Sequence, residues 1–289
     1  MIIGIDAGGT STKGALINEQ GKAVFTCRSG FGNPLIDYKK ALENIKETVQ
    51  ICMDSASEKI EHIIIGMAGF NTVKSEVNLA KNWEATVTLM TDAELALEAA
   101  VPSGSGILTI AGTGSVHIGK TREDIYISGG WGHLLGDEGG GYSIGRHAIR
   151  YTLNDLESAG PLSQLSQHIL TRIQKKDIND VKNWFYKQSK TEVASLAEEV
   201  LQLAAKDFAA TSILDQEAEQ LALQVDRFYK KMALDSNAKL VVSGSVLLNN
   251  EVYFERFKQY IKNSFFKIEK MNVPAYMGAY SYYKRNHTN

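Results

Sequence analysis

Residues 2–12 read IIGIDAGGTST, an apolar strand that runs directly into a glycine turn with hydroxyl side chains. Similar segments follow at residues 107–115, ILTIAGTGS, and at residues 240–245, LVVSGS. Glycine lets backbone N–H groups approach phosphate oxygens because no side chain stands in the way, and neighbouring hydroxyls add donors. Any one of these segments is compatible with a plain turn. The three together predict a nucleotide held between two related lobes.

The motifs of two common nucleotide-binding folds are absent from the sequence. It contains neither a Walker pattern, GxxxxGK followed by Ser or Thr, nor an intact GxGxxG before a helix. This argues against P-loop and Rossmann proteins. Asp6 instead stands at the end of the first strand, where a carboxylate can hold a magnesium ion against phosphates, directly or through its waters.

The composition indicates a soluble globular protein of two domains. The chain has 289 residues, a mass of 31.8 kDa and 44% hydrophobic residues, enough for a substantial core. A formal net charge of −2 and a pI near 6.3 provide no basic surface for nucleic acid or for an anionic membrane. We therefore expect small molecules, or a second copy of the chain, as partners.

Nothing in the sequence indicates export or membrane insertion. The first strand begins without a preceding basic segment, and no apolar run approaches the length of a membrane span. Cys27 and Cys52 lack metal-ligand spacing and are interpreted as core thiols, with Cys52 on the apolar stripe of a helix. These features predict a cytoplasmic protein.

The order of predicted elements favours an α/β fold built on a mixed sheet with helical cover. Hairpins near the N-terminus precede alternating strands and helices, and residues 102–106, PSGSG, form the best linker. After this linker the strand, turn and strand of the N-terminus recur, which is consistent with an internal duplication. The expected lobes are a smaller one, residues 1–103 with 275–289, and a larger one, residues 104–274.

The apolar patterns predict the individual elements beyond the first hairpins. Strands are expected at 62–67, 86–90, 107–110, 116–120, 240–242 and 266–271, and helices at 38–58, 72–81, 93–100, 144–156, 162–173, 181–186, 192–207, 215–233 and 275–285.

Asp92 stands between a predicted strand, residues 86–90, and a predicted helix, residues 93–100. Ligands collect beyond the carboxyl ends of parallel strands, so this position suits a catalytic carboxylate. An aspartate directly before a helix is also a common N-cap. Both interpretations of Asp92 are open at this point.

Residues 128–141 read SGGWGHLLGDEGGG, a glycine-rich stretch that contains one tryptophan. Trp131 offers an apolar face to a sugar ring, and Asp137 and Glu138 offer acceptors to its hydroxyls. The alternative is a solvated turn before a helix capped by Ser143, with Trp131 in the core. Because binding residues concentrate on loops, the stretch favours a sugar site. His133 lacks a second ligand at metal spacing and suits a hydrogen-bonded structural role better than zinc.

These motifs together resemble the BadF/BadG/BcrA/BcrD ATPase family, within the superfamily of acetate kinase, sugar kinases, Hsp70 and actin, and most closely its N-acetylglucosamine kinases. The resemblance covers nearly the whole chain, and its most specific part is GGWGH followed by GDEG, residues 129–133 and 136–139. It implies the two-domain, ribonuclease H-like fold of actin and hexokinase, with mixed sheets and helices on both faces. It also implies ATP and Mg²⁺ as cofactors.

The resemblance assigns roles to individual residues. For the nucleotide it implies the three glycine loops, with Gly8, Gly9, Thr10, Gly112, Thr113, Gly114, Ser115 and Gly244, and with Asp6 holding magnesium. For the sugar it implies Asn33, Asp92, Gly130, Trp131 and Asp137, with Asp92 as the catalytic base.

Two departures from related proteins limit the choice of function. Family members that activate acyl-CoA enzymes bind an iron–sulfur cluster through cysteines, and Cys27 and Cys52 do not match those positions. The Cys-rich zinc motif of ROK sugar kinases is missing as well.

The resemblance thus implies a homodimer that phosphorylates the 6-hydroxyl of an amino sugar, with N-acetylglucosamine as the first candidate. One alternative keeps the kinase and changes the acceptor to glucosamine, glucose or N-acetylmuramic acid, because one side-chain contact can settle that preference. A second is an ATP-driven switch that acts on another protein, which the missing cluster cysteines disfavour. A third is a sugar sensor without turnover, which the presence of both Asp6 and Asp92 disfavours.

Overall fold

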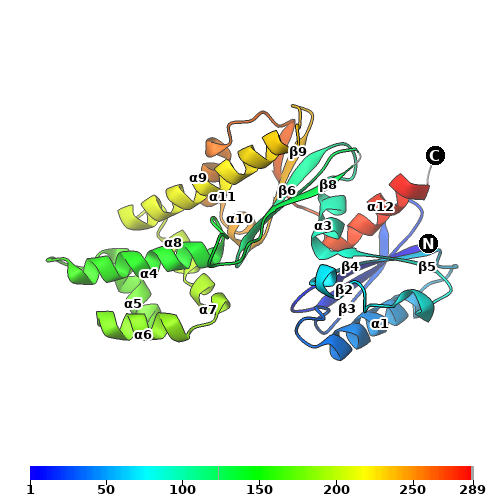
Figure 1. The fold of residues 1–289 in the computed structure, drawn as a ribbon, viewed down its shortest axis with the longest axis horizontal. Coiled ribbons are helices and arrows are strands. Elements are labelled where there is room, and N and C mark those ends of the chain that lie inside the picture. The colour runs from blue at the N-terminus through cyan, green and yellow to red at the C-terminus, as the bar shows by residue number, and fades with distance from the viewer. Residues whose placement is uncertain (123, 288–289) are drawn as a thin grey trace. The chain divides into compact units, whose positions relative to one another are not determined.

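The computed structural model describes residues 1–122 and 124–287 of the chain. The chain divides into two compact units (Figure 1). The N-terminal unit consists of residues 1–104 together with the segment from residue 271 onward, and the central unit consists of residues 105–270.

A five-stranded mixed sheet forms the centre of the N-terminal unit. Its strand order is β3 (Ala23–Ser29), β2 (Thr12–Ile17), β1 (Ile2–Ala7), β4 (His62–Met67) and β5 (Thr86–Thr91). Strands β1, β2 and β3 pair antiparallel, whereas β1, β4 and β5 pair parallel. The carboxyl ends of β1 and β5 therefore lie at the same edge of the sheet, on either side of β4.

Helices cover both faces of this sheet because successive strand residues point to opposite faces. Ile3 and Ile5 pack with Ile45 of α1 (Tyr38–Asp54), and Ile2 packs on the other face with Leu95 of α3 (Asp92–Ala100). Helix α12 (Gly278–His287) joins that second face, so the C-terminal segment returns to the N-terminal sheet (Figure 1). The remaining short elements are α2 (Phe70–Val73), η1 (Ala80–Asn82) and η2 (Ala275–Met277).

The two cysteines lie in the layer between the sheet and α1. Cys27 Sγ and Cys52 Sγ are 3.4 Å apart, and neither forms a disulfide. Burial, together with the neighbouring Cys27, raises the pKa of the Cys52 thiol. A thiol with a raised pKa is a poor nucleophile, which agrees with a packing role.

The central unit repeats the sheet of the N-terminal unit. Its strand order is β10 (Lys267–Lys270), β9 (Lys239–Ser243), β6 (Gly106–Ala111), β7 (Ser115–Lys120) and β8 (Ile125–Gly129). Strands β6, β7 and β8 pair antiparallel, whereas β6, β9 and β10 pair parallel. Read from β8 to β10, the strands of this sheet have the same order and directions as those of the N-terminal sheet read from β3 to β5. The short sequence similarity between the two glycine turns thus accompanies a repeat of the whole sheet.

Helices make up most of the central unit and share one hydrophobic core with its sheet. They are α4 (Gly141–Glu157), α5 (Gln164–Ile173), α6 (Ile178–Lys187), α7 (Lys190–Ser195), α8 (Ala197–Gln202), α9 (Phe208–Lys231), α10 (Ser245–Leu248) and α11 (Glu251–Tyr260). None of the helices in residues 1–122 and 124–287 is both long and apolar enough to cross a membrane.

Several elements differ from the sequence-based expectation: helix α10 was not expected, and α9 begins at Phe208 rather than at residue 215. Strand β8 and helix α11 were not expected, because β8 is short and ends in glycine and α11 is rich in charged residues. The helix expected at residues 72–81 is reduced to α2 and η1, in a segment with β-branched and asparagine residues of low helix propensity. The helix expected at residues 192–207 is interrupted at Leu196, whose N–H bonds to Val193 in a tighter turn.

Candidate functional site

The first glycine turn is held by a bond of its own and by two neighbouring segments of the N-terminal unit. Gly8 N–H donates to the Ser11 carbonyl at 3.0 Å and closes the turn. Gly32 N–H donates to the Gly8 carbonyl at 2.8 Å, and Ala68 N–H to the Ala7 carbonyl at 2.9 Å. Gly9 and Thr10 remain exposed at the tip. The turn is therefore fixed by its base and free to contact a ligand at its tip.

Asn33 lies next to this turn, on the loop between β3 and α1. Its Oδ1 accepts the N–H of Leu35 at 2.9 Å, so the side-chain oxygen is used in the loop itself. A β-carbon at Gly69 would lie 2.8 Å from the same oxygen, which places Asn33 against the segment after β4. The amide nitrogen is the atom of Asn33 best suited to a ligand.

Asp92 is the first residue of α3, and it is not the helix cap. Thr91 fills that role: its Oγ1 accepts the Glu94 N–H at 3.1 Å, and Glu94 Oε2 accepts the Thr91 N–H at 2.7 Å. The interpretation of Asp92 as an N-cap is thus wrong, because the capping box begins one residue earlier. Asp92 Oδ1 accepts the adjacent Ala93 N–H at 2.9 Å.

Asp6 and Asp92 form a pair of partly buried carboxylates at the edge where β1 and β5 end. Burial raises the pKa of Asp6; Lys13 opposes this shift, and the charge of Asp92 adds to it. Burial also raises the pKa of Asp92, partly offset by the Ala93 N–H. The two carboxylates are therefore close enough to interact electrostatically.

This pair fits a magnesium ion that also binds phosphates. Mg²⁺ usually keeps several waters and takes one or two carboxylates plus phosphate oxygens rather than a cage of protein ligands. Within residues 1–122 and 124–287 there is no cluster of three or more His, Cys, Asp or Glu side chains suited to a metal. Asp6, near the end of β1, is the residue of this pair that could hold Mg²⁺.

The second glycine turn, in the central unit, is tied to the start of α4. Gly141 N–H donates to the Gly112 carbonyl at 2.8 Å, and Tyr142 N–H to the Thr113 carbonyl at 2.9 Å. Ser115 is buried, and its hydroxyl donates to the Glu138 carbonyl at 2.8 Å. Thr113 is exposed. The hydroxyl available to a ligand on this turn is therefore that of Thr113.

Gly244 brings the third glycine loop close to the second. It has a φ of +89°, and a β-carbon there would overlap the backbone of Ala111 at the end of β6. A residue with a side chain at this position would be strained and would push β9 away from β6. The sequence Ser-Gly-Ser thus allows the ends of two parallel strands to meet.

A cavity of about 450 Å³ opens beside these two loops and lies entirely within the central unit. Its walls come from the second glycine turn, the start of α4, helices α7 and α8, and the turn from α10 to α11: Gly112, Thr113, Gly141, Thr191, Ala194, Ser195, Ala197, Glu198, Leu201, Gln202, Ser245, Val246, Asn249 and Asn250. This volume is in the range of small-molecule sites.

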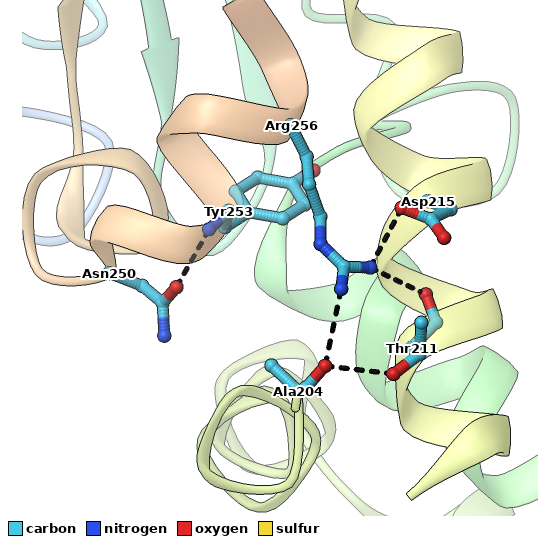
Figure 2. A network of polar contacts seen from close by, with 6 residues as sticks. All are labelled: Ala204, Thr211, Asp215, Asn250, Tyr253 and Arg256. Atoms are coloured by element: carbon cyan, nitrogen blue, oxygen red, sulfur yellow. Dashed lines mark hydrogen bonds and ion pairs between the residues drawn. The ribbon is translucent and has the colours of Figure 1, made fainter. Parts of the chain in front are cut away.

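Arg256 connects three segments of the central unit that are close in sequence to residues of this cavity. Figure 2 shows its guanidinium donating to Asp215 Oδ1 at 2.7 Å, to the Thr211 carbonyl at 3.0 Å and to the Ala204 carbonyl at 3.2 Å. These bonds connect α11 to α9 and to the segment after α8. Asn250, at the cavity, caps α11 by accepting the Tyr253 N–H at 2.8 Å.

The glycine-rich stretch 128–141 is divided into a buried and an exposed part. Asp137 is only 4% exposed, adopts a φ of +68° and pairs with Lys190 Nζ at 2.6 Å. Trp131 is 70% exposed within its unit, so its interpretation as a core residue is wrong. Gly130 precedes it with a φ of +69°, a conformation that glycine allows.

A buried polar network supports this stretch from beneath, and the sequence analysis did not identify it. Glu217 of α9 accepts the Gly139 N–H at 2.5 Å and the Ser143 hydroxyl at 2.7 Å. Gln224, also on α9, bonds to Glu138 at 2.8 Å and to His117 at 3.0 Å. Burial lowers the pKa of His117 to about 4, so this histidine is neutral at physiological pH. Glu217 and Gln224 were missed because polar residues in a long helix give no local signal of contacts with segments far along the chain.

His133 has a packing role. Its ring lies edge-on to Tyr142, with centroids 4.6 Å apart. Among residues 1–122 and 124–287, no hydrogen bond of the His133 side chain of the kind expected from the sequence is found.

The predicted residues thus fall into two groups. The N-terminal unit brings together Asp6, Gly8, Gly9, Thr10, Asn33 and Asp92, and the central unit brings together Gly112, Thr113, Gly114, Ser115, Asp137 and Gly244, with Gly130 and Trp131 on the adjoining loop.

Two sheets of the same strand order, each with a glycine turn after its first strand, define a two-domain α/β ATPase fold of the actin and hexokinase type. Residues 3–280 match the BadF/BadG/BcrA/BcrD ATPase family, and the chain belongs to this family. This confirms the resemblance inferred from the sequence.

Two relatives of established activity are similar over nearly the whole chain. The chain is 27% identical over 286 residues to the N-acetylmuramic acid/N-acetylglucosamine kinase of Clostridium acetobutylicum, covering 94% of each protein. It is 28% identical over 302 residues to the N-acetyl-D-glucosamine kinase of Dictyostelium discoideum, covering 94% of this chain and 93% of the other.

Among solved structures, a candidate N-acetylglucosamine kinase from Chromobacterium violaceum has the same fold. It superposes with a TM-score of 0.75 at 20% identity and covers 96% of both chains.

Proposed function

We propose that the chain is an ATP-dependent sugar kinase that phosphorylates the 6-hydroxyl of an amino sugar, with N-acetylglucosamine as its preferred acceptor. Family membership and the activities of the two relatives support the reaction class. The single observation that supports the mechanism is Asp92: a partly buried carboxylate with a raised pKa, at a strand end, with no capping role.

Asp92 acts in this proposal as the base for the sugar hydroxyl. A carboxylate is too weak to ionise an alcohol beforehand, so its main contribution is to orient the hydroxyl and to take up the proton late in the loose transition state. The burial that raises its pKa makes it a better proton acceptor than an exposed aspartate. Asp6 would hold Mg²⁺, which would neutralise part of the phosphate charge.

The central unit holds the nucleotide in this proposal. The 450 Å³ cavity takes the adenosine, and the N–H groups and Thr113 hydroxyl of the turn at its edge take phosphate oxygens. Gly9 and Thr10 offer the corresponding groups of the N-terminal unit. Trp131 and Gly130 are the groups that the central unit offers to the sugar, and Asn33 is the corresponding group of the N-terminal unit.

A coupled assay for ADP release tests this function. Purified protein with MgATP is offered N-acetylglucosamine, N-acetylmuramic acid, glucosamine, N-acetylmannosamine and glucose in turn. We expect the highest kcat/KM with N-acetylglucosamine. ADP release that no sugar accelerates would disprove the kinase and revive the ATP-driven switch.

N-acetylmuramic acid is the second acceptor to consider, because the Clostridium relative acts on both sugars. A higher kcat/KM for N-acetylmuramic acid in the same assay would change the preferred acceptor and leave the reaction unchanged. We further propose a cytoplasmic homodimer, a state that sedimentation equilibrium of the purified protein tests.

A further inference from the structure

One lysine lies between the buried carboxylate of the glycine-rich stretch and the nucleotide cavity. Lys190 is the first residue of α7, and the next residue, Thr191, lines the cavity. Lys190 Nζ is 2.6 Å from Asp137 Oδ2, and the lysine side chain is 35% exposed. All of these groups belong to the central unit.

The carboxylate that Lys190 binds lies directly on the second glycine turn. A β-carbon at Gly114 would overlap Asp137 Oδ2 and would lie 2.6 Å from its Cγ. Ser115 N–H points to Asp137 Oδ1 at 3.4 Å, a long contact that neutralises little charge. Gly114 thus lacks a side chain because the Asp137 carboxylate fills that space.

This arrangement creates an electrostatic conflict with the proposed nucleotide. A buried carboxylate beside a turn that receives phosphates repels them, and the repulsion is strong where water is excluded. Lys190 is the cation that the structure pairs with Asp137, and its ammonium binds the same oxygen that overlies Gly114. Without Lys190, a phosphate bound at the turn would face the uncompensated negative charge of Asp137.

We propose that Lys190 is a positioning residue for phosphate binding: it holds Asp137 against Gly114 and neutralises the carboxylate so that the turn can accept the phosphates of the nucleotide. This inference depends on the proposed function, because it assumes that the turn 112–115 binds phosphate. It predicts that removing the Lys190 charge weakens the affinity for a nucleotide more when the nucleotide carries more phosphate charge. The affinity for adenosine should not change.

Equilibrium binding without sugar tests the inference separately from catalysis. The affinities of the full-length protein for adenosine, AMP and Mg–ADP are measured by calorimetry for the wild type and for Lys190→Met, Lys190→Arg, Asp137→Asn and the double variant Lys190→Met with Asp137→Asn. We expect Lys190→Met to weaken Mg–ADP by roughly tenfold or more and to leave adenosine unchanged. Lys190→Arg keeps the charge and should keep most of the affinity. The double variant should recover much of the loss, because it removes the carboxylate as well.

The outcomes that overturn the inference are distinct from those that overturn the function. Equal losses for adenosine and Mg–ADP would mean that Lys190 only supports the cavity wall, and an unchanged Mg–ADP affinity would remove its role. A double variant as weak as Lys190→Met would mean that Lys190 does not act by compensating Asp137. A wild-type protein that binds no adenine nucleotide would instead refute the proposed function. Lys187→Met, at an exposed lysine near the end of α6, is the matched control.

Discussion

Asp92 occupies the point where β5 becomes α3, one residue after the threonine that caps the helix. Because Thr91 Oγ1 accepts the Glu94 N–H, Asp92 is not the N-cap, although its own Oδ1 accepts the Ala93 N–H of the first turn. A carboxylate that is partly buried and has a raised pKa, yet does not cap its helix, is typical of a functional group.

Replacing Asp92 by asparagine separates catalysis from stability. We expect kcat to fall by roughly 100-fold or more, the size of a general-base contribution, while sugar affinity is retained. The melting temperature should stay the same or rise: burial raises the Asp92 pKa in the folded chain, so its ionised form disfavours folding at neutral pH, and asparagine removes that cost. Steady-state kinetics and thermal melts check both effects, with Asp54→Asn at an exposed position of α1 as control. A loss of sugar affinity with unchanged kcat would contradict the role as base.

The pH dependence of activity tests the protonation state of Asp92. The free enzyme needs Asp92 ionised, and its raised pKa means that protonation begins at a higher pH than for an ordinary aspartate. We therefore expect kcat/KM for the sugar to fall on the acid side with an apparent pKa above about 3.9, the usual aspartate value. An acid limb at or below that value would show that the environment does not act on the base as described.

Elements outside the glycine turns hold the candidate site in place, and Arg256 is the clearest example. It joins α11 to α9 and to the carbonyl of Ala204 after α8, so one guanidinium connects the segments that follow the cavity residues Gln202 and Asn250 (Figure 2). Hydrogen bonds from a charged donor contribute more than neutral ones.

Arg256→Met should therefore loosen the cavity while keeping the apolar part of the side chain. We expect the free energy of unfolding to fall by about 1–3 kcal/mol and adenosine binding to weaken. Urea unfolding and calorimetry measure the two effects, and Arg227→Met, at an exposed arginine of α9, serves as control. Lower stability with unchanged adenosine affinity would show that Arg256 does not set the cavity walls.

The sequence predicted the elements whose signal lies in neighbouring residues, and it missed contacts between residues far apart in the chain. The apolar strands that end in glycine turns were predicted because both signals lie within a dozen residues. Strand β8 could have been found as the counterpart of β3, since the two sheets have the same order, but its own pattern is too short. Lys190, Glu217 and Gln224 had no local signal, because each contacts the stretch 137–143 from far along the chain.

For the whole molecule, the buried histidine of β7 links stability to pH. His117 bonds to Thr109 and Gln224 within the core of the central unit, and burial lowers its pKa to about 4. The unfolded chain has an ordinary histidine pKa near 6.5 and binds the proton more readily. Its stabilising contribution is therefore complete above about pH 6.5 and is lost as the pH falls towards 4.

Between about pH 6.5 and pH 4, we expect the free energy of unfolding to fall by roughly 3 kcal/mol more in the wild type than in His117→Gln. Urea titrations at several pH values measure the difference, with His168→Gln at a more exposed histidine as control. Parallel pH curves for the wild type and His117→Gln would mean that His117 is not buried in its neutral form.

Each unit supplies a sheet with a glycine turn, and the repeat of the sheet order was only partly visible as an echo in the sequence. In the proposed reaction, this chain transfers the γ-phosphoryl group of ATP to the 6-hydroxyl of N-acetylglucosamine. A proton–phosphorus correlation NMR spectrum of the product formed from MgATP and that sugar tests this reaction. We predict a phosphate coupled to the protons on carbon 6; a phosphate coupled to any other position, or ADP and inorganic phosphate alone, would contradict the proposed reaction.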